Sequence, residues 1–289
     1  YEIFEPWWYL NRYRLNLGVD HQMLYSTRSF ESFSIMPSAF FVTKNFFAGG
    51  WNANFSPVEE YDFFEPRTPG RFVKYPASYG QEFWISTDYR KPFALDVRLY
   101  NNTWLEGPYN HWNINISPRF RFSDQLFMVY DFKGGAESNN LGYAGSSGDT
   151  VYMGYRNIES VTNSIATSYN INPDLSITLD FRHYFTQIVY TNYQHLNQDG
   201  TVSEIDTDLH RDLTFNSVNL DLKLNWWFVP GSTVSVLYRN SLLNNSPDID
   251  DSYFESLEDL SALPFLHQLS FRLTYFLDYN DVVKWSKRK

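Results

Sequence analysis

The sequence predicts an all-β protein, an antiparallel transmembrane β-barrel, and three observations carry that prediction. Apolar and polar residues alternate along one segment after another, which places the apolar side chains of each strand on one face. Short and long connections alternate along the chain, as they do in barrels whose short turns face the periplasm. Aromatic residues make up 19% of the 289 residues, more than a core needs, whereas barrels carry aromatic girdles at both bilayer interfaces.

The stretch 216–239 shows this design most clearly. Between Val218 and Phe228 every second residue is apolar, and most of the residues between them are polar. A helix could not place that set on one face, so the stretch is predicted to be a strand. The chain then reverses at the Pro-Gly-Ser sequence of residues 230–232 and resumes the alternation at Val234, which predicts a hairpin.

The first half of the chain repeats the pattern. Alternating residues predict strands over residues 13–19, 33–41, 47–55, 83–85, 93–99, 112–122 and 126–132. The stretch 112–122 is long for a soluble strand but suits a tilted spanning one. A polar loop is expected around residues 20–28, and a long Pro-rich, charged loop over residues 56–79 contains aromatics that favour an ordered structure.

The second half adds strands over residues 161–171, 175–189, 218–228, 234–239 and 269–277, which brings the count to about twelve. The Gly/Ser/Asn-rich stretch 134–159 is expected to be a loop with a small extra strand at residues 151–153. An acidic loop is expected over residues 244–264, and a basic tail from Lys284 to Lys289. Tight connections fall at Lys44, Asp88, Ser123, Asn172 and Pro230, and longer ones follow Asp20, Phe55, Leu99, Lys133, Tyr190 and Leu243.

Composition excludes several other classes of protein. The net charge of −10 argues against a nucleic-acid partner, which would attract clustered Lys and Arg. A mean hydropathy of −0.43 and the lack of a long apolar run exclude a helical membrane protein. With no cysteine there is no disulfide, thiol nucleophile or thiolate metal site.

We interpret residues 1–289 as one outer-membrane β-barrel domain. The chain starts at Tyr1 without a signal peptide, so either a signal was cleaved or the chain is the C-terminal part of a longer one, which we favour. The full protein would then contain more strands. An open sheet edge in lipid is prohibitively costly, so either these strands close alone or other strands complete them.

Several motifs resemble one family. They are YDFFEPRTPGR at 61–71, ISTDYRKPFALD at 85–96, ISPRFRF at 116–122, FRHY at 181–184, FVPGS at 228–232 and LTYFLDY at 273–279. They resemble the C-terminal outer-membrane barrel region of Gram-negative surface proteins catalogued as a domain of unknown function. That region usually follows a periplasmic domain similar to carbohydrate-binding module family nine. The resemblance covers most of the chain.

The resemblance implies an outer-membrane location and a missing N-terminal domain, through which a saccharide would be a partner. The bilayer, lipopolysaccharide and other surface proteins are the remaining expected partners. The family supplies no catalytic residue, and no cofactor or metal is expected.

Charged residues recur on the polar side of the predicted strands and are candidates to line the barrel lumen. They could form a selective pore, but their interleaved signs favour a neutralising network that fills or hydrates the interior. The candidates are Arg98, Arg119, Arg121, Asp180, Arg182, Asp221, Lys223, Arg239 and Arg272.

The aromatic loop supplies a second candidate site, an outer-loop contact made of Tyr61, Phe63, Phe64 and Arg67. This loop could stack on a sugar or dock on another protein, and the default expectation is that it folds over the barrel mouth. The acidic loop 244–264 could bind calcium, but it lacks the glycine and fixed spacing of an EF-hand, so a solvated loop is favoured.

His183 and His267 fall on the apolar phase of their strands, where a polar ring is unexpected. A lipid hydrolase would place a Ser-His pair there, yet no particular serine stands out. We therefore expect a non-enzymatic barrel that forms the membrane-embedded part of a larger surface assembly. The alternative is a passive channel for small solutes or saccharides.

Overall fold

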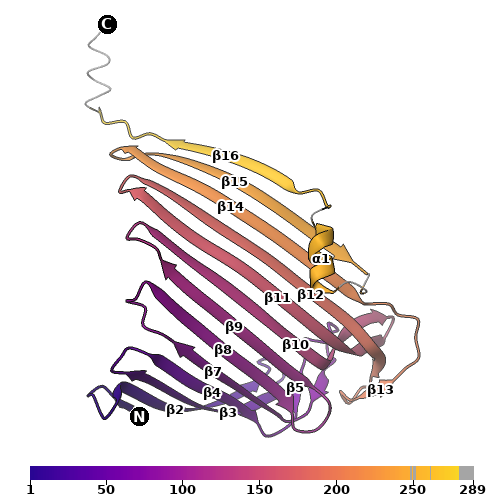
Figure 1. Ribbon diagram of the computed structural model, residues 1–289. Helices are drawn as coiled ribbons and strands as arrows, with labels where there is room; N and C mark the ends of the chain where they lie inside the picture. The colour runs from indigo at the N-terminus through magenta and orange to yellow at the C-terminus, as the bar shows by residue number, and fades with distance from the viewer. Residues whose placement is uncertain (248, 250–251, 261, 280–289) are drawn as a thin grey trace.

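The computed structural model describes residues 1–247, 249, 252–260 and 262–279. It consists of one large antiparallel sheet in which neighbours in the chain are neighbours in space (Figure 1). The strands of this sheet are β1 (Glu2–Ile3), β2 (Leu10–Met23), β3 (Phe30–Thr43), β4 (Ala48–Ser56), β7 (Ser78–Ser86), β8 (Phe93–Trp104), β9 (Asn110–Arg121), β10 (Leu126–Ser147), β11 (Thr150–Asn172), β12 (Leu175–Leu196), β13 (Val202–Glu204), β14 (Leu213–Val229), β15 (Ser232–Ser246) and β16 (Leu266–Thr274).

The all-β, antiparallel prediction is confirmed, and all twelve predicted strands are present. The sheet has fourteen strands because β1 and β13 are short additions of two and three residues. A separate two-stranded sheet, β5 (Glu60–Asp62) with β6 (Val73–Tyr75), lies within the long loop after β4. In the described residues the sheet is open, because β16 pairs only with β15 and β1 pairs with β2 only at Tyr13 and Arg14.

Strand register aligns the apolar residues of neighbouring strands on one face of the sheet, which we call the apolar face. Leu222 lies opposite Leu179 on one side and Tyr238 on the other, and Tyr238 lies opposite Leu269. Leu222 is 42% exposed and Phe271 66% exposed. The described residues therefore place no second sheet over this part of the apolar face.

Polar side chains share the opposite face, which we call the charged face. Arg98 lies opposite Asn115, and Asn115 lies opposite Lys133. Asp221 lies between Asp180 and Arg239 in the same way. The period-two pattern therefore sorts the two kinds of side chain as the sequence predicts.

The prediction of a loop over residues 134–159 is wrong, because β10 and β11 continue through this stretch as strands of 22 and 23 residues. Glycines in this stretch make room for large neighbours. A Cβ on Gly142 would lie 2.3 Å from the Arg156 guanidinium, and one on Gly154 would lie 2.5 Å from the Tyr190 ring. Register shifts in both β10–β11 and β11–β12 meet at Arg156. They form a crease across three strands, because bulges bend the strands that contain them.

A hydrophobic cluster of buried residues lies beyond this crease, at the long-loop end of the sheet. It contains Val73, Leu141, Val151, Met153 and Leu196, of which Val73, Met153 and Leu196 are fully buried. Val73 comes from β6 and the other four come from the extended ends of β10, β11 and β12. Packing against the loop after β4 thus explains why a Gly/Ser/Asn-rich stretch forms strands.

A short helix, α1 (Tyr253–Leu260), occupies part of the predicted acidic loop. Ser252 and Glu255 form a capping box, in which the Ser252 amide donates to Glu255 Oε2 at 2.9 Å and the Glu255 amide donates to Ser252 Oγ at 3.4 Å. These bonds hold the pKa of Glu255 below its usual value. Among the described residues, no helix is long and apolar enough to cross a membrane.

Candidate functional site

All nine candidate lumen residues lie on the charged face, and the register shows which of them can meet. Ion pairs join Arg119 to Asp96 at 3.1 Å, Arg98 to Glu82 at 3.6 Å and Arg239 to Asp221 at 2.6 Å. The Arg239–Asp221 pair is bidentate, with a second bond of 2.7 Å from Arg239 Nε. These pairs include four of the nine candidates, Arg98, Arg119, Asp221 and Arg239.

The described residues show no such ion pair for the other five candidates. In the described part of the chain, no ion pair within 4 Å includes the following candidates: Arg121, Asp180, Arg182, Lys223 and Arg272. Asp180 lies opposite Asp221, whose carboxylate is already bonded to Arg239. The face is thus a mixture of compensated and uncompensated charges, as a hydrated surface tolerates.

The short turn between β7 and β8 is locked by the residues of its Asp-Tyr-Arg motif. Arg90 donates to both carboxylate oxygens of Asp88 at 2.8 Å, and its guanidinium lies 3.5 Å from the Phe46 ring centroid in the next short turn. Tyr89 donates to the Asp96 carboxylate and lies under Arg119, 4.6 Å from the guanidinium. This motif therefore ties two turns and the charged face together.

Hydrogen bonding from Arg90 lowers the pKa of Asp88 to about 2, from an ordinary 3.8. Because the folded pKa is the lower one, the stabilisation is complete above about pH 4 and is lost as the pH falls through 2. We expect Arg90→Gln to return the pKa toward 3.8. The backbone amide of residue 90 donates to Asp88 Oδ1, so its NMR shift against pH gives the measurement. Lys91→Gln is the control, since it removes a nearby charge without breaking that bond; equal changes in the two variants would contradict the assignment.

The long loop after β4, residues 57–77, crosses to the ends of β10–β12, and we call it the strap. Arg71 donates to the Asn197 carbonyl at 3.1 Å, to the Asp149 carbonyl at 3.4 Å and to the Leu196 carbonyl. Tyr75 donates to the Leu141 carbonyl at 3.1 Å. Burial and neighbouring carboxylates raise the pKa of Tyr75 above its usual value, so its hydroxyl remains a donor. These bonds fasten the strap at several points.

The sequence motif at residues 61–71 shapes the strap. Asp62 Oδ1 accepts from the amides of Phe64 and Glu65 at 2.7 and 2.9 Å, which makes a turn. Glu65 Oε1 then accepts from the Tyr143 amide at 2.7 Å and lies 3.8 Å from Arg156. The motif therefore holds the strap against the crease region of β10 and β11.

The four candidate contact residues of the loop divide into two kinds. Phe72 packs on Phe63 with ring centroids 5.3 Å apart and on Tyr61 at 5.6 Å, so those two rings hold the strap together. Phe64 is 69% exposed, and Arg67 lies over the Tyr143 ring at 4.8 Å. Phe64 and Arg67 are thus the pair available to an outside molecule.

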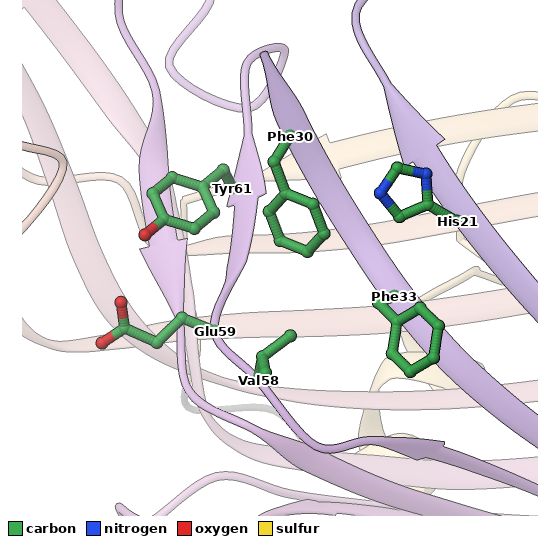
Figure 2. A pocket seen from close by; sticks show the side chains of 6 residues that line it. All are labelled: His21, Phe30, Phe33, Val58, Glu59 and Tyr61. Carbon is green, nitrogen blue, oxygen red and sulfur yellow. The ribbon is translucent and has the colours of Figure 1, made fainter.

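A hollow of about 470 Å³ lies between the strap and the loop ends of β2 and β3. Figure 2 shows Phe30 and Phe33 on β3, His21 on β2, and Val58, Glu59 and Tyr61 on the strap. Phe30 contacts Tyr61 and His21, with ring centroids 5.9 and 5.7 Å apart. The hollow has apolar walls, and its polar groups are a carboxylate, an imidazole and a phenol hydroxyl. Nothing in the sequence pointed to it, because its residues come from three separate segments.

His183 belongs to a buried polar chain beneath α1. Its Nε2 lies 3.2 Å from Asn216 Oδ1, and Asn216 Nδ2 donates to Ser256 Oγ at 2.7 Å. His183 and Ser256 are 3% and 4% exposed. Since an amide separates the imidazole from the hydroxyl, and both are buried, the arrangement serves to fix α1 on the sheet. His267, in contrast, is exposed on β16, where Tyr238 and Asn240 hydrogen-bond to its ring.

No group of three or more His, Cys, Asp or Glu residues in the described part of the chain is arranged to hold a metal ion. In the acidic loop 244–264, for which the sequence favours a solvated loop over a calcium site, Asp248, Asp250 and Asp251 lie outside the described residues, as does the basic tail from Lys284 to Lys289.

Comparison with known proteins gives one result. The family model described as "Domain of unknown function (DUF5916)" matches residues 1–286. Searches of curated proteins and of solved structures gave no match. Because the match covers nearly the whole chain, the open sheet, the strap and the turn motifs described above are those of a member of this family, and the chain belongs to the DUF5916 family.

Proposed function

We propose that this chain is an outer-membrane β-barrel domain that acts as the membrane-embedded, non-enzymatic part of a larger cell-surface assembly. The observation that carries the proposal is the apolar face, which runs in register across the long strands and is widely exposed. Leu17 on β2, Leu99 on β8 and Leu269 on β16 are 69%, 49% and 76% exposed. In water such a surface would be an aggregation site, whereas lipid covers it at no cost.

The asymmetry of the connections supports an orientation in the bilayer. Five tight reversals lie at one end of the strands, and the ordered strap and α1 lie toward the other end, together with a sixth tight reversal at residues 148–149 between β10 and β11 (Figure 1). Barrels carry short turns on the periplasmic side and elaborate loops outside. In this orientation Phe64 and Arg67 face the cell exterior, where lipopolysaccharide or another surface protein can reach them.

A closed barrel requires partners for the free edges of β2 and β16. Unpaired backbone N–H and C=O groups in hydrocarbon cost several kcal/mol each. The two edges therefore pair with each other or with other strands in the membrane.

The charged face favours one alternative, a passive channel for small solutes or saccharides, because charged lumens set the selectivity of pores. Planar-bilayer conductance of the full-length protein separates the two functions. We expect no steady current, because the strap crosses the sheet ends and ion pairs neutralise part of the charged face. A steady open-channel current would support the channel and contradict the scaffold. If the Arg121→Glu substitution then changed the ion selectivity of the channel, the current would run along the charged face.

A further inference from the structure

Helix α1 packs on the apolar face of the sheet, not on the charged one. Tyr253 at its first turn contacts Phe185 and His183 with ring centroids 5.5 and 5.8 Å apart, and its hydroxyl accepts from Asn163 at 2.8 Å. Asn163 and His183 lie opposite each other in the register, and His183 lies opposite Val218, so all three share the apolar face. The helix is therefore on the side that the proposed function turns toward lipid.

The helix also marks a level along the strands. On β12, the apolar residues Ile177, Leu179 and Phe181 precede His183 as the strand runs toward the long-loop end. Polar side chains appear on this face from here on, beside the buried Phe185, and those near the helix are hydrogen-bonded: Tyr130 donates to Asn163 at 2.5 Å and Asn216 donates to Ser256 at 2.7 Å. The helix thus sits where the apolar surface ends, which is the position of the boundary between hydrocarbon and headgroups.

Because successive helical residues are 100° apart, the residues of α1 point in different directions, and they fall into three groups. Tyr253, Ser256 and Leu260 point to the sheet, and Ser256 and Leu260 are buried. Phe254 and Leu257 form an apolar flank and are 74% and 42% exposed. Glu255 and Asp259 lie on the opposite flank, also exposed. A helix with an apolar flank and an acidic flank has a preferred orientation at an interface.

We propose that α1 is an interfacial helix whose Phe254–Leu257 flank inserts into the outer leaflet beside the barrel. The occupant of this flank is the acyl-chain and headgroup boundary of lipid, because the flank continues the apolar face of the strands below it. The acidic flank faces water. This inference rests on the proposed function, since the apolar face must first contact hydrocarbon.

The absence of cysteine from the chain makes the test direct, because one introduced thiol is the only labelling site. Phe254→Cys, Asp259→Cys and Leu222→Cys variants are each labelled with an environment-sensitive fluorophore and reconstituted in phosphatidylcholine vesicles. Half of the vesicles contain lipids brominated on the acyl chains, which quench on contact. We expect quenching of at least about two-fold at residues 222 and 254, and little at residue 259.

Each result decides between the two proposals. Quenching at residue 222 without quenching at residue 254 would overturn the helix inference and leave the barrel in place. An equal response at residues 254 and 259 would do the same, because the flanks would then not differ. A lack of quenching at residue 222 would overturn the proposed function and the inference with it. Phe254 and Asp259 are exposed, so these substitutions are not expected to disturb folding.

Discussion

Replacing Leu222 with arginine is expected to lower the free energy of unfolding in a bilayer by about 2–4 kcal/mol, the cost of an arginine on the lipid face near the midplane of a membrane barrel. Leu222 lies midway along the apolar residues of β14 and is 42% exposed. If this face contacted water instead, a surface substitution there would change stability by less than about 1 kcal/mol. The size of the loss in unfolding free energy therefore shows whether the apolar face contacts lipid or water.

The matched control is Asn219→Arg, three residues away on the same strand but on the charged face. Asn219 lies opposite Arg182 and Ser241, so an added cation there remains among polar groups, and we expect a loss below about 1 kcal/mol. Guanidinium unfolding of both variants in the same vesicles provides the comparison. Equal losses in the two variants, or a wild-type chain that stays monodisperse in buffer without detergent, would refute a lipid-facing surface.

The second large effect is expected at Val73, where aspartate should release the strap and speed tryptic cleavage after Arg67 by about 100-fold or more. Val73 is fully buried against Leu141, Met153 and their neighbours, and an unpaired carboxylate in such a site costs several kcal/mol. Cleavage follows the population of the open form, and about 1.4 kcal/mol changes that population tenfold.

Val58→Asp is the control for this prediction. It introduces the same charge into the same loop at a residue that is 45% exposed, and it should leave the cleavage rate within about two-fold. Time courses analysed by mass spectrometry locate the first cut. If the two variants were cleaved at the same rate, the hydrogen bonds of Arg71 and Glu65 would be sufficient to hold the strap, and the buried cluster would not be its main anchor.

The strands and their two faces could be predicted from sequence because a pleated strand has a strict period of two. Every alternating segment from β2 to β16 carries that signal in its own residues. The long ends of β10 and β11 do not, because their many Gly, Ser and Asn residues are typical of loops. These residues form strands because the ends of β10 and β11 pack against Val73, and because Gly142 and Gly154 leave space for large neighbouring side chains.

Helix α1 was missed although a signal was available. Ser252 and Glu255 have the spacing of a capping box, followed by apolar residues at helical intervals. The acidic composition of the surrounding stretch concealed it. The wider lesson is that local hydrogen-bonding motifs can be read from sequence even inside a polar loop.

The charged face could be predicted as a set but not as pairs. Parity alone puts Arg119 and Arg121 on one face, whereas the register decides that Arg119 meets Asp96 and that Arg121 lies opposite Phe127. The hollow of Figure 2 was beyond prediction for a similar reason. Its walls unite β2, β3 and the strap, and no local pattern reports which distant segments meet.

If the apolar face contacts lipid, the strands β10, β11 and β12 each run from hydrocarbon, below α1, to an end beyond the crease at Arg156. Beyond the crease, the cluster around Val73 is stabilised by the exclusion of water, a driving force that weakens on cooling because its heat-capacity change is large. Below the level of α1, hydrocarbon surrounds the strands at any temperature. Lowering the temperature should therefore destabilise the outer ends of β10–β12 while the portions in hydrocarbon keep their stability. The same set of hydrogen-bonded strands would then respond to cooling in two different ways.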